Sequence, residues 1–353
     1  MSVQGEQAAS WGPPYLLYLG SATDELAIKT ARGLAYWRPQ WCLGQHRRAD
    51  CAVTLELPDI ALAQGRNEGA QTMVIGAANA GGVMGPEMVA DAIAALEAGL
   101  HVVSGLHHKL RDHPDIVAAA RAHGRTLFDA RAAQPGTPVG TGKPRAGRRL
   151  LTVGTDCSVG KMYTALALER SLRRRGHLAD FRATGQTGIL IAGAGIPVDA
   201  VVADFISGAA EVISPARNDG GWDLIEGQGS LFHPSYAGVS LGLLHGSQPD
   251  ALVLCHEPTR RHMRGLPDYP IPDLVACMEA NLAAARLTNP AVKPVGIALN
   301  TSNLPGHEAR AICERVGALF GLPCEDPVTM GVEAITDHLI ASFANCQQRE
   351  LSV

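Results

Sequence analysis

One segment near the middle of the chain restricts the fold more than any other. It reads Leu150-Leu-Thr-Val-Gly-Thr-Asp-Cys-Ser-Val-Gly-Lys-Met162, an apolar strand with a glycine-rich turn, and leads into an expected helix over 160–175. A glycine turn between a buried strand and a helix start presents backbone N–H groups to an anion, and the helix dipole adds positive charge there. The segment therefore predicts an α/β domain with a phosphate-binding loop.

The lysine of this loop strengthens the interpretation. Only five of the 30 basic residues are lysines, and Lys161 directly follows Gly160, where a P-loop places its phosphate-binding lysine. A chance glycine turn beside a surface lysine is the alternative. We expect the following residues to bind the phosphates of a cofactor: Gly154, Thr155, Asp156, Cys157, Ser158, Val159, Gly160, Lys161 and Met162.

The loop departs from the usual GxxxxGK[ST] pattern in two places. The first glycine is residue 154 instead of 155, and Met162 stands where a Ser or Thr hydroxyl would bind magnesium. A thioether is a poor ligand for a hard cation. The loop is therefore better suited to holding phosphates than to breaking them, and we expect no metal site.

Strand-like and helix-like segments alternate on both sides of the loop. This alternation predicts parallel βαβ units. We expect an α/β fold with two doubly wound domains, the first Rossmann-like and the second P-loop NTPase-like. The expected elements include strands over Cys51–Leu57 and Ala251–His256, a helix over Leu274–Arg286 and a final long helix over Glu308–Phe320. The expected boundaries are a tail over 1–14, the Rossmann-like domain over 15–131, a flexible linker over 132–148 and the P-loop-like domain over 149–353.

Composition excludes several classes of protein. The net charge of −4 argues against nucleic acid as a partner. No apolar run is long enough to span a membrane, and no secretory signal is visible, so we expect a cytoplasmic protein. The eight cysteines form no CxxC pair, which favours reduced thiols over disulfides or zinc. Only 18% of residues are charged, which favours a homo-oligomer with little charged surface.

An acidic residue follows another expected strand, Asp223–Glu226. Glu226 is followed by a Gly227-Gln-Gly229 turn. The carboxyl ends of parallel strands line the ligand crevice of such sheets, so Glu226 should face the phosphate loop, where it could act as a general base. A structural carboxylate that caps the turn is the alternative.

Other polar side chains follow the remaining strands, and the residues after Thr184 are expected to form glycine turns. His256 is a candidate acid or base, Arg260 a candidate clamp for a substrate carboxylate, and Asp156 a third candidate catalytic residue. A structural role is the alternative for His256 and Arg260. We expect the substrate to contact Gln186, Thr187, Gln228, Gly229, Arg260 and Asn300.

In their order along the chain, these motifs resemble one bacterial family, the DgcN-like D-glutamate N-acetyltransferases, formerly known only as a domain of unknown function. The resemblance runs from about Tyr15 to His338. The matching pieces are Lys29-Thr-Ala-Arg-Gly-Leu34, Arg38-Pro-Gln-Trp-Cys-Leu-Gly-Gln45, Val103-Ser-Gly-Leu-His107, Asp129-Ala-Arg131, the Gly154–Met162 loop, Thr184-Gly-Gln-Thr-Gly188, Glu226-Gly-Gln-Gly229, His256-Glu-Pro-Thr-Arg260 and Gly296-Ile-Ala-Leu-Asn-Thr-Ser302.

The resemblance implies acetyl transfer from acetyl-CoA to the amine of an acidic D-amino acid. CoA carries phosphates that the loop could bind without hydrolysing them, which makes Met162 tolerable. Glu226 would then be the base. Two alternatives stay open. The loop is also similar to that of dethiobiotin synthetase, so an ATP-dependent ligase or kinase is one, and a non-catalytic nucleotide- or CoA-binding protein is the other.

Overall fold

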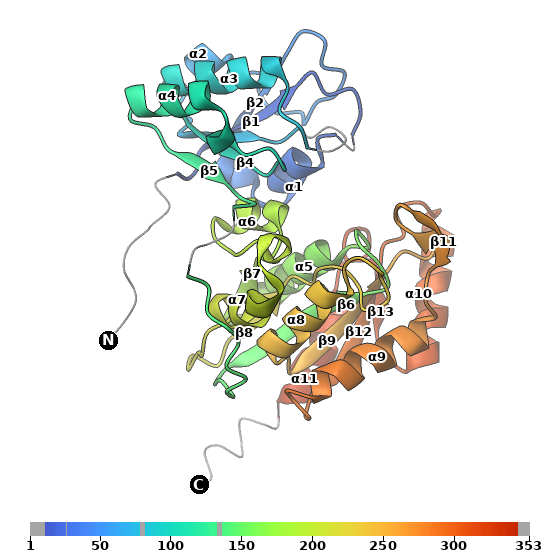
Figure 1. Cartoon of the computed structure of the whole chain (residues 1–353). Helices are drawn as coiled ribbons and strands as arrows, with labels where there is room; N and C mark the ends of the chain where they lie inside the picture. The colour runs from blue at the N-terminus through green and yellow to red at the C-terminus, as the bar shows by residue number, and fades with distance from the viewer. Residues whose placement is uncertain (1–10, 26, 78–81, 133–135, 345–353) are drawn as a thin grey trace. The chain divides into compact units, whose positions relative to one another are not determined.

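The computed structural model describes residues 11–25, 27–77, 82–132 and 136–344 (Figure 1). The chain forms two compact units. Unit 1 comprises Met1–Ala133 together with Gln186–Pro197, and unit 2 comprises Gln134–Gly185 together with Val198–Val353. The chain thus leaves unit 2 for twelve residues before it returns. The sequence pattern did not predict this excursion.

Unit 1 is built on a parallel sheet. Its strands are β1 (Tyr15–Gly20), β2 (Cys42–Arg47), β3 (Thr72–Ile75), β4 (His101–Ser104) and β5 (Leu127–Asp129). Its helices are α1 (Lys29–Trp37), α2 (Leu62–Gly65), α3 (Pro86–Glu97), α4 (Pro114–Ala122) and α6 (Gln186–Ala192). The strand order is β2-β1-β3-β4-β5. One core cluster joins the sheet to α2, α3 and α4, with Leu16, Met73 and Leu96 among its fully buried members. The expected doubly wound, Rossmann-like architecture is confirmed.

The strand expected over Cys51–Leu57 is wrong. The segment carries alternating apolar residues, but the side chain of Gln45 accepts the Leu55 N–H, and Glu56 has φ +60°. A left-handed residue interrupts an extended strand. The edge strand of this region is instead β2, which packs parallel to β1. Its sequence Cys-Leu-Gly-Gln-His-Arg lacks the apolar run that would have revealed it.

Unit 2 contains a longer parallel sheet. Its main strands are β6 (Arg148–Gly154), β7 (Ala179–Arg182), β8 (Trp222–Ile225), β9 (Ala251–His256), β12 (Lys293–Leu299) and β13 (Cys324–Glu325), and a separate hairpin is formed by β10 (His262–Met263) and β11 (Leu266–Pro270). Its helices are α5 (Lys161–Arg174), α7 (Ile206–Ile213), α8 (Ala237–Ser247), α9 (Leu274–Arg286), α10 (Gly306–Phe320) and α11 (Glu333–Phe343). Right-handed crossovers place α7, α8 and α9 on one face, whereas α5 and α11 pack together on the other (Figure 1).

Three sequence expectations are corrected in unit 2 and its excursion. The helix over Glu308–Phe320 is present as α10, but it is not the last, because β13 and α11 follow it. Residues after Thr184, expected as glycine turns, begin α6. The stretch 136–147 contains no helix or strand, yet it is held to unit 2, since Glu211 accepts the Thr141 and Gly142 N–H groups. The idea of a freely flexible linker therefore does not describe these residues.

The order of the unit 2 sheet determines where a ligand can bind. The strands run in the order β13-β12-β9-β6-β8-β7, so β6 lies between β9 and β8. Ligands of open parallel sheets bind at the carboxyl ends of strands where the connections diverge to either side. Here β6 continues to the sheet edge at β7, whereas β8 connects back across β6 to β9. The ends of these three strands carry Gly154, Glu226 and His256.

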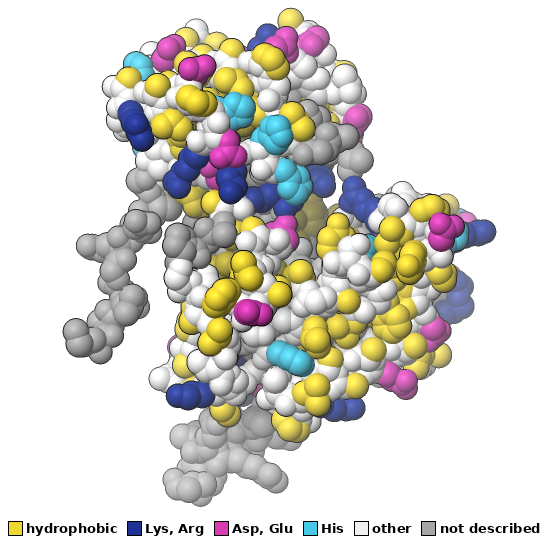
Figure 2. Space-filling model, viewed as in Figure 1, with side chains coloured by type: hydrophobic (Ala, Val, Ile, Leu, Met, Phe, Trp, Pro, Cys, Tyr) yellow, Lys and Arg dark blue, Asp and Glu magenta, His cyan; other side chains and the backbone are white. Residues whose placement is uncertain are grey.

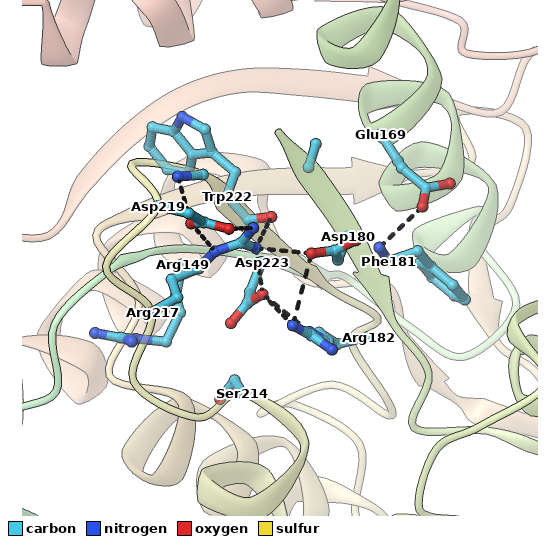
Figure 3. Close-up of polar contacts among 12 residues, drawn as sticks. Arg149, Glu169, Asp180, Phe181, Arg182, Ser214, Arg217, Asp219, Trp222 and Asp223 are labelled. Atoms are coloured by element: carbon cyan, nitrogen blue, oxygen red, sulfur yellow. Dashed lines mark hydrogen bonds and ion pairs between the residues drawn. The ribbon is translucent and has the colours of Figure 1, made fainter. Parts of the chain in front are cut away.

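An ionic network surrounds the buried carboxylate of Asp223 in β8 (Figure 3). Asp223 is fully buried, and its Oδ1 accepts from Arg182 at 2.9 Å and from Arg217 at 2.8 Å. Arg217 also binds Asp219 through two nitrogens at 2.8 Å each and Asp180 at 3.0 Å. Buried charges are stable only when paired in this way. The network therefore ties β7 and the start of β8 to the loop that precedes β8.

The surface of unit 2 reflects the low content of charged residues. On the face shown in Figure 2, apolar side chains are more prominent than acidic or basic ones. Among the apolar side chains of unit 2, Leu241 of α8 and the neighbouring Tyr236 are 40% and 49% exposed. Within the described residues, no helix combines the length and the apolar character needed to cross a membrane.

Candidate active site

The phosphate loop connects β6 to α5 within unit 2. The helix begins at Lys161, directly after Gly160, which has φ +102° and therefore requires a residue without a Cβ. Ser158 also has a positive φ, +55°. Left-handed residues in such a turn direct successive N–H groups to one side, as an anion cradle needs. Met162 is the second residue of the helix, so no hydroxyl follows the lysine.

Lys161 lies beneath the loop. It is 6% exposed, and its Nζ donates to the carbonyl oxygen of Asp156 at 2.6 Å. Burial lowers the pKa of its ammonium group. In this state the lysine braces the loop internally, at the position from which a P-loop lysine meets a phosphate.

Asp156 is the node that holds the loop in place. It is fully buried; its Oδ1 accepts the Cys157 N–H at 2.7 Å, and its Oδ2 accepts from Arg260 at 2.7 Å and from the Arg264 N–H at 2.8 Å. Arg260 also donates to the carbonyl oxygens of Cys157 and Ser158, at 2.7 and 3.3 Å, and pairs with Glu257. Arg260 thus stabilises the phosphate loop from its outer side. These contacts favour a structural role for Arg260 over binding of a substrate carboxylate.

Glu226 directly follows β8 and is 5% exposed. Its Oε2 accepts the backbone N–H groups of Thr184 and Gly185, both at 3.0 Å. Burial raises the pKa of this carboxyl group to about 7, although the two backbone donors and the nearby Lys161 oppose the rise. A carboxyl group with a pKa near neutrality is suited to accept a proton at physiological pH.

The turn after Glu226 lies close to β6. A Cβ on Gly227 would lie 1.7 Å from the Thr152 carbonyl oxygen, so only glycine fits, and the Gly227 N–H donates to Thr152 Oγ1 at 3.0 Å. The side chain of Gln228 donates to Thr184 Oγ1 at 3.2 Å. A Cβ on Gly229 would lie 2.7 Å from the Tyr236 carbonyl oxygen. The turn is thus wedged between β6 and the start of α8, which sets the position of Glu226.

His256 and Asn300 lie at the ends of neighbouring strands. The Nδ1 of His256 is hydrogen-bonded to Thr155 Oγ1 at 2.9 Å, and burial lowers its pKa to about 4. At neutral pH this imidazole is uncharged, and its pKa is less well matched to base catalysis than that of Glu226. The N–H of Asn300 donates to the His256 carbonyl oxygen, and its side chain lies beside Gly160 at the end of the loop.

Two predicted substrate residues belong to the other unit. Gln186 and Thr187 start α6, which packs on α1 of unit 1. Thr187 Oγ1 is 3.2 Å from Thr30 Oγ1, and Gln186 lies against Gly105. Their role in substrate binding stays a prediction.

Two further residues of the site were missed at the level of sequence. The guanidinium of Arg264 donates to Ser158 Oγ at 2.6 Å, and its backbone N–H donates to Asp156. His233 brings its Nε2 to 3.9 Å from Asp156 Oδ1. Arg264 had no distinguishing pattern among 25 arginines. For His233, its place four residues after Gly229 of the glycine turn was a usable signal.

Two family models together cover most of the chain. Residues 138–336 match the model described as "Domain of unknown function (DUF1611_C) P-loop domain", and residues 46–133 match the corresponding "DUF1611_N" Rossmann-like domain. The chain belongs to this family. Both expected domain folds are thereby confirmed.

Named relatives extend this match to almost the full length. A D-glutamate N-acetyltransferase of a Pseudoalteromonas species is 50% identical over 93% of this chain and 98% of its own. A D-glutamate N-acetyltransferase of Tritonibacter scottomollicae is 51% identical with the same coverage. A solved DUF1611 family protein from Anabaena variabilis has a TM-score of 0.82 at 32% identity, covering 93% of this chain and 99% of that one.

Proposed function

We propose that this protein is a D-glutamate N-acetyltransferase that uses acetyl-CoA as its acetyl donor. The observation that carries the proposal is the match to two proteins of that name at about 50% identity over 93% of the chain. The geometry of unit 2 supports the donor. A glycine loop with a lysine can hold the phosphates of CoA, and Met162 deprives it of the hydroxyl that a magnesium-dependent phosphoryl transfer uses.

Glu226 is the base in this proposal. Substrate amines are ammonium ions at neutral pH, and a proton must leave before the nitrogen can attack a thioester carbonyl. The Glu226 carboxylate, with a pKa of about 7, takes that proton. The new C–N bond forms as the C–S bond to CoA breaks. The second proton of the nitrogen goes to the departing thiolate, so that CoA leaves as a thiol.

The loop and its supports bind and orient the donor. Lys161 and the N-terminal N–H groups of α5 supply positive charge to the CoA phosphates. The Asp156–Arg260 pair holds the outer side of the loop, so only a small rearrangement of these N–H groups is needed when the donor arrives. Preorganised donors of this kind can also stabilise the oxyanion formed at the thioester carbonyl.

The test is acetyl transfer by the purified protein. With acetyl-CoA and D-glutamate, release of the CoA thiol and formation of N-acetyl-D-glutamate are expected in equal amounts, and L-glutamate serves as the stereochemical comparison. A parallel reaction contains ATP and magnesium in place of acetyl-CoA. ADP release in that reaction, with no thiol release in the first, would replace the proposal by an ATP-dependent ligase or kinase. Self-association and a cytoplasmic location stay predictions from the sequence.

A further inference from the structure

A buried hydrogen-bond donor next to the phosphate loop has no use in the chemistry described so far. His233 is 2% exposed, and its Nε2 has no hydrogen-bond partner within the described parts of the chain. The charged group facing it is Asp156, whose Oδ1 is 3.9 Å away. This separation is about 1 Å longer than a hydrogen bond. An unpaired buried polar group costs free energy, so such a group calls for an explanation.

The other ring nitrogen identifies the hydrogen on Nε2. His233 Nδ1 accepts the Ser235 N–H at 3.1 Å, so the lone pair of Nδ1 is used. A neutral imidazole carries one N–H. The hydrogen is therefore on Nε2, and it points toward an acceptor that is slightly out of reach. The ring itself is held in place by contact with Tyr236, with ring centroids 4.5 Å apart.

A metal ion between Asp156, Cys157 and His233 would be the first alternative. Their ligand atoms lie within 4.8 Å of one another. However, ligation by Nε2 requires a lone pair there and a hydrogen on Nδ1, which faces an N–H donor. Burial also raises the pKa of the Cys157 thiol, whereas a metal needs the thiolate. The charge of Asp156 is already balanced by Arg260 at 2.7 Å.

We propose that His233 is a positioning residue that latches the phosphate loop when the acyl donor binds. The loop closes by about 1 Å, and Nε2–H of His233 then donates to Asp156 Oδ1. Hydrogen bonds of a site are often long in the free protein and shorten in the complex. His233 follows the turn that begins at Glu226, so the latch couples occupancy of the loop to the position of the base. The inference rests on the proposed binding of CoA phosphates by this loop.

Two substitutions separate the latch from a purely structural role. His233→Asn places an amide where Nδ1 lies, so it keeps an acceptor for Ser235 and loses the donor toward Asp156. His233→Gln does the reverse, because its amide nitrogen reaches the Nε2 position. If the latch matters, His233→Asn weakens CoA binding about ten- to hundredfold, which is the loss expected for a hydrogen bond to a charged group. His233→Gln then retains most of the wild-type affinity for CoA. If the histidine only supports the turn through its acceptor for the Ser235 N–H, His233→Gln weakens CoA binding more than His233→Asn does.

The measurements are the Kd for CoA by calorimetry and the increase in melting temperature on adding CoA. The latch is absent from the free protein, so His233→Asn should reduce the CoA-induced increase in melting temperature more than His233→Gln does. His245→Asn and His245→Gln are matched controls. His245 Nε2 is likewise buried without a partner in the described chain, but it lies in the last turn of α8, and we expect CoA binding to stay unchanged.

Three results would overturn the latch. The first is a larger loss of CoA affinity with His233→Gln than with His233→Asn. The second is a distance between His233 Nε2 and Asp156 Oδ1 that is still near 3.9 Å in a crystal structure of the wild-type protein with CoA. The third is CoA binding that is lost on chelation and restored by zinc. The last result would assign the three residues to a metal. The wild-type protein separates this inference from the proposed function. If it transfers acetyl groups but His233→Gln binds CoA more weakly than His233→Asn, only the latch fails. If it does not bind CoA, both fail.

Discussion

Replacing Glu226 with Gln tests the base and its environment in one variant. The substitution keeps the size of the side chain, and the Gln oxygen can still accept the Thr184 and Gly185 N–H groups. It removes the site of proton transfer and the buried charge. Because these two losses act on different quantities, activity and stability should move in opposite directions.

The magnitudes follow from the pKa. Burial raises the pKa of Glu226 from 4.5 to about 7, and each tenfold change in acidity is about 1.4 kcal/mol, so the ionised carboxylate costs the folded protein up to about 3 kcal/mol. The folded chain binds this proton more tightly than the unfolded chain. The contribution of Glu226 to stability is therefore fully present below pH 4.5 and is lost as the pH rises through about 7.

Two assays read these effects. Loss of the base should lower kcat by roughly 10²- to 10⁴-fold, with a smaller change in KM for acetyl-CoA. Wild-type kcat/KM should rise with pH through about 7, as the carboxyl group ionises. In urea unfolding, the variant should be more stable than the wild type at pH 8 and closely similar to it at pH 4.5. Glu169→Gln is the control: Glu169 is a buried carboxylate in the C-terminal half of α5 that accepts the Phe181 N–H, and its replacement should leave kcat unchanged.

The base assignment is refuted if Glu226→Gln retains more than about a tenth of the wild-type kcat. The account of its environment fails separately, if the stability difference between variant and wild type does not grow from pH 4.5 to pH 8.

Three further changes probe the loop, the turn and the ionic network. Lys161→Ala should weaken CoA binding by about tenfold or more, because the loop loses its cation, and unchanged calorimetric affinity would count against the loop. Gly227→Ala should destabilise unit 2 severely, since its Cβ would lie 1.7 Å from a backbone oxygen; a melting temperature equal to that of the wild type would contradict the close approach. Asp223→Ala removes the buried partner of Arg182 and Arg217, of which Arg217 keeps Asp219 and Asp180, and should cost about 1 to 3 kcal/mol in urea unfolding, while the same stability as wild type would show the network to be unimportant.

The fold was largely predictable because its signals are local. Apolar runs such as Ala251–His256 and the helical pattern of Leu274–Arg286 lie where they were expected, since buried parallel strands and amphipathic helices have patterns of their own. Failures occurred where side-chain contacts to the backbone overrode the pattern. The segment after Cys51 alternates like a strand, but the side chain of Gln45, ten residues before Leu55, accepts the Leu55 N–H, and Glu56 adopts a positive φ.

By itself, the sequence determined the class of fold, the phosphate loop and the placement of Glu226 at a strand end, because each is written in neighbouring residues. Only the tertiary structure decided how these parts act together. The strand order brings Asp156 beside Arg260, so that Arg260 binds the loop. It also encloses Glu226, and this burial raises the pKa of the carboxyl group to near neutrality. The same order places His233 opposite Asp156, across 77 positions of sequence. Strand order arises from packing the whole sheet, and no local spacing encodes it.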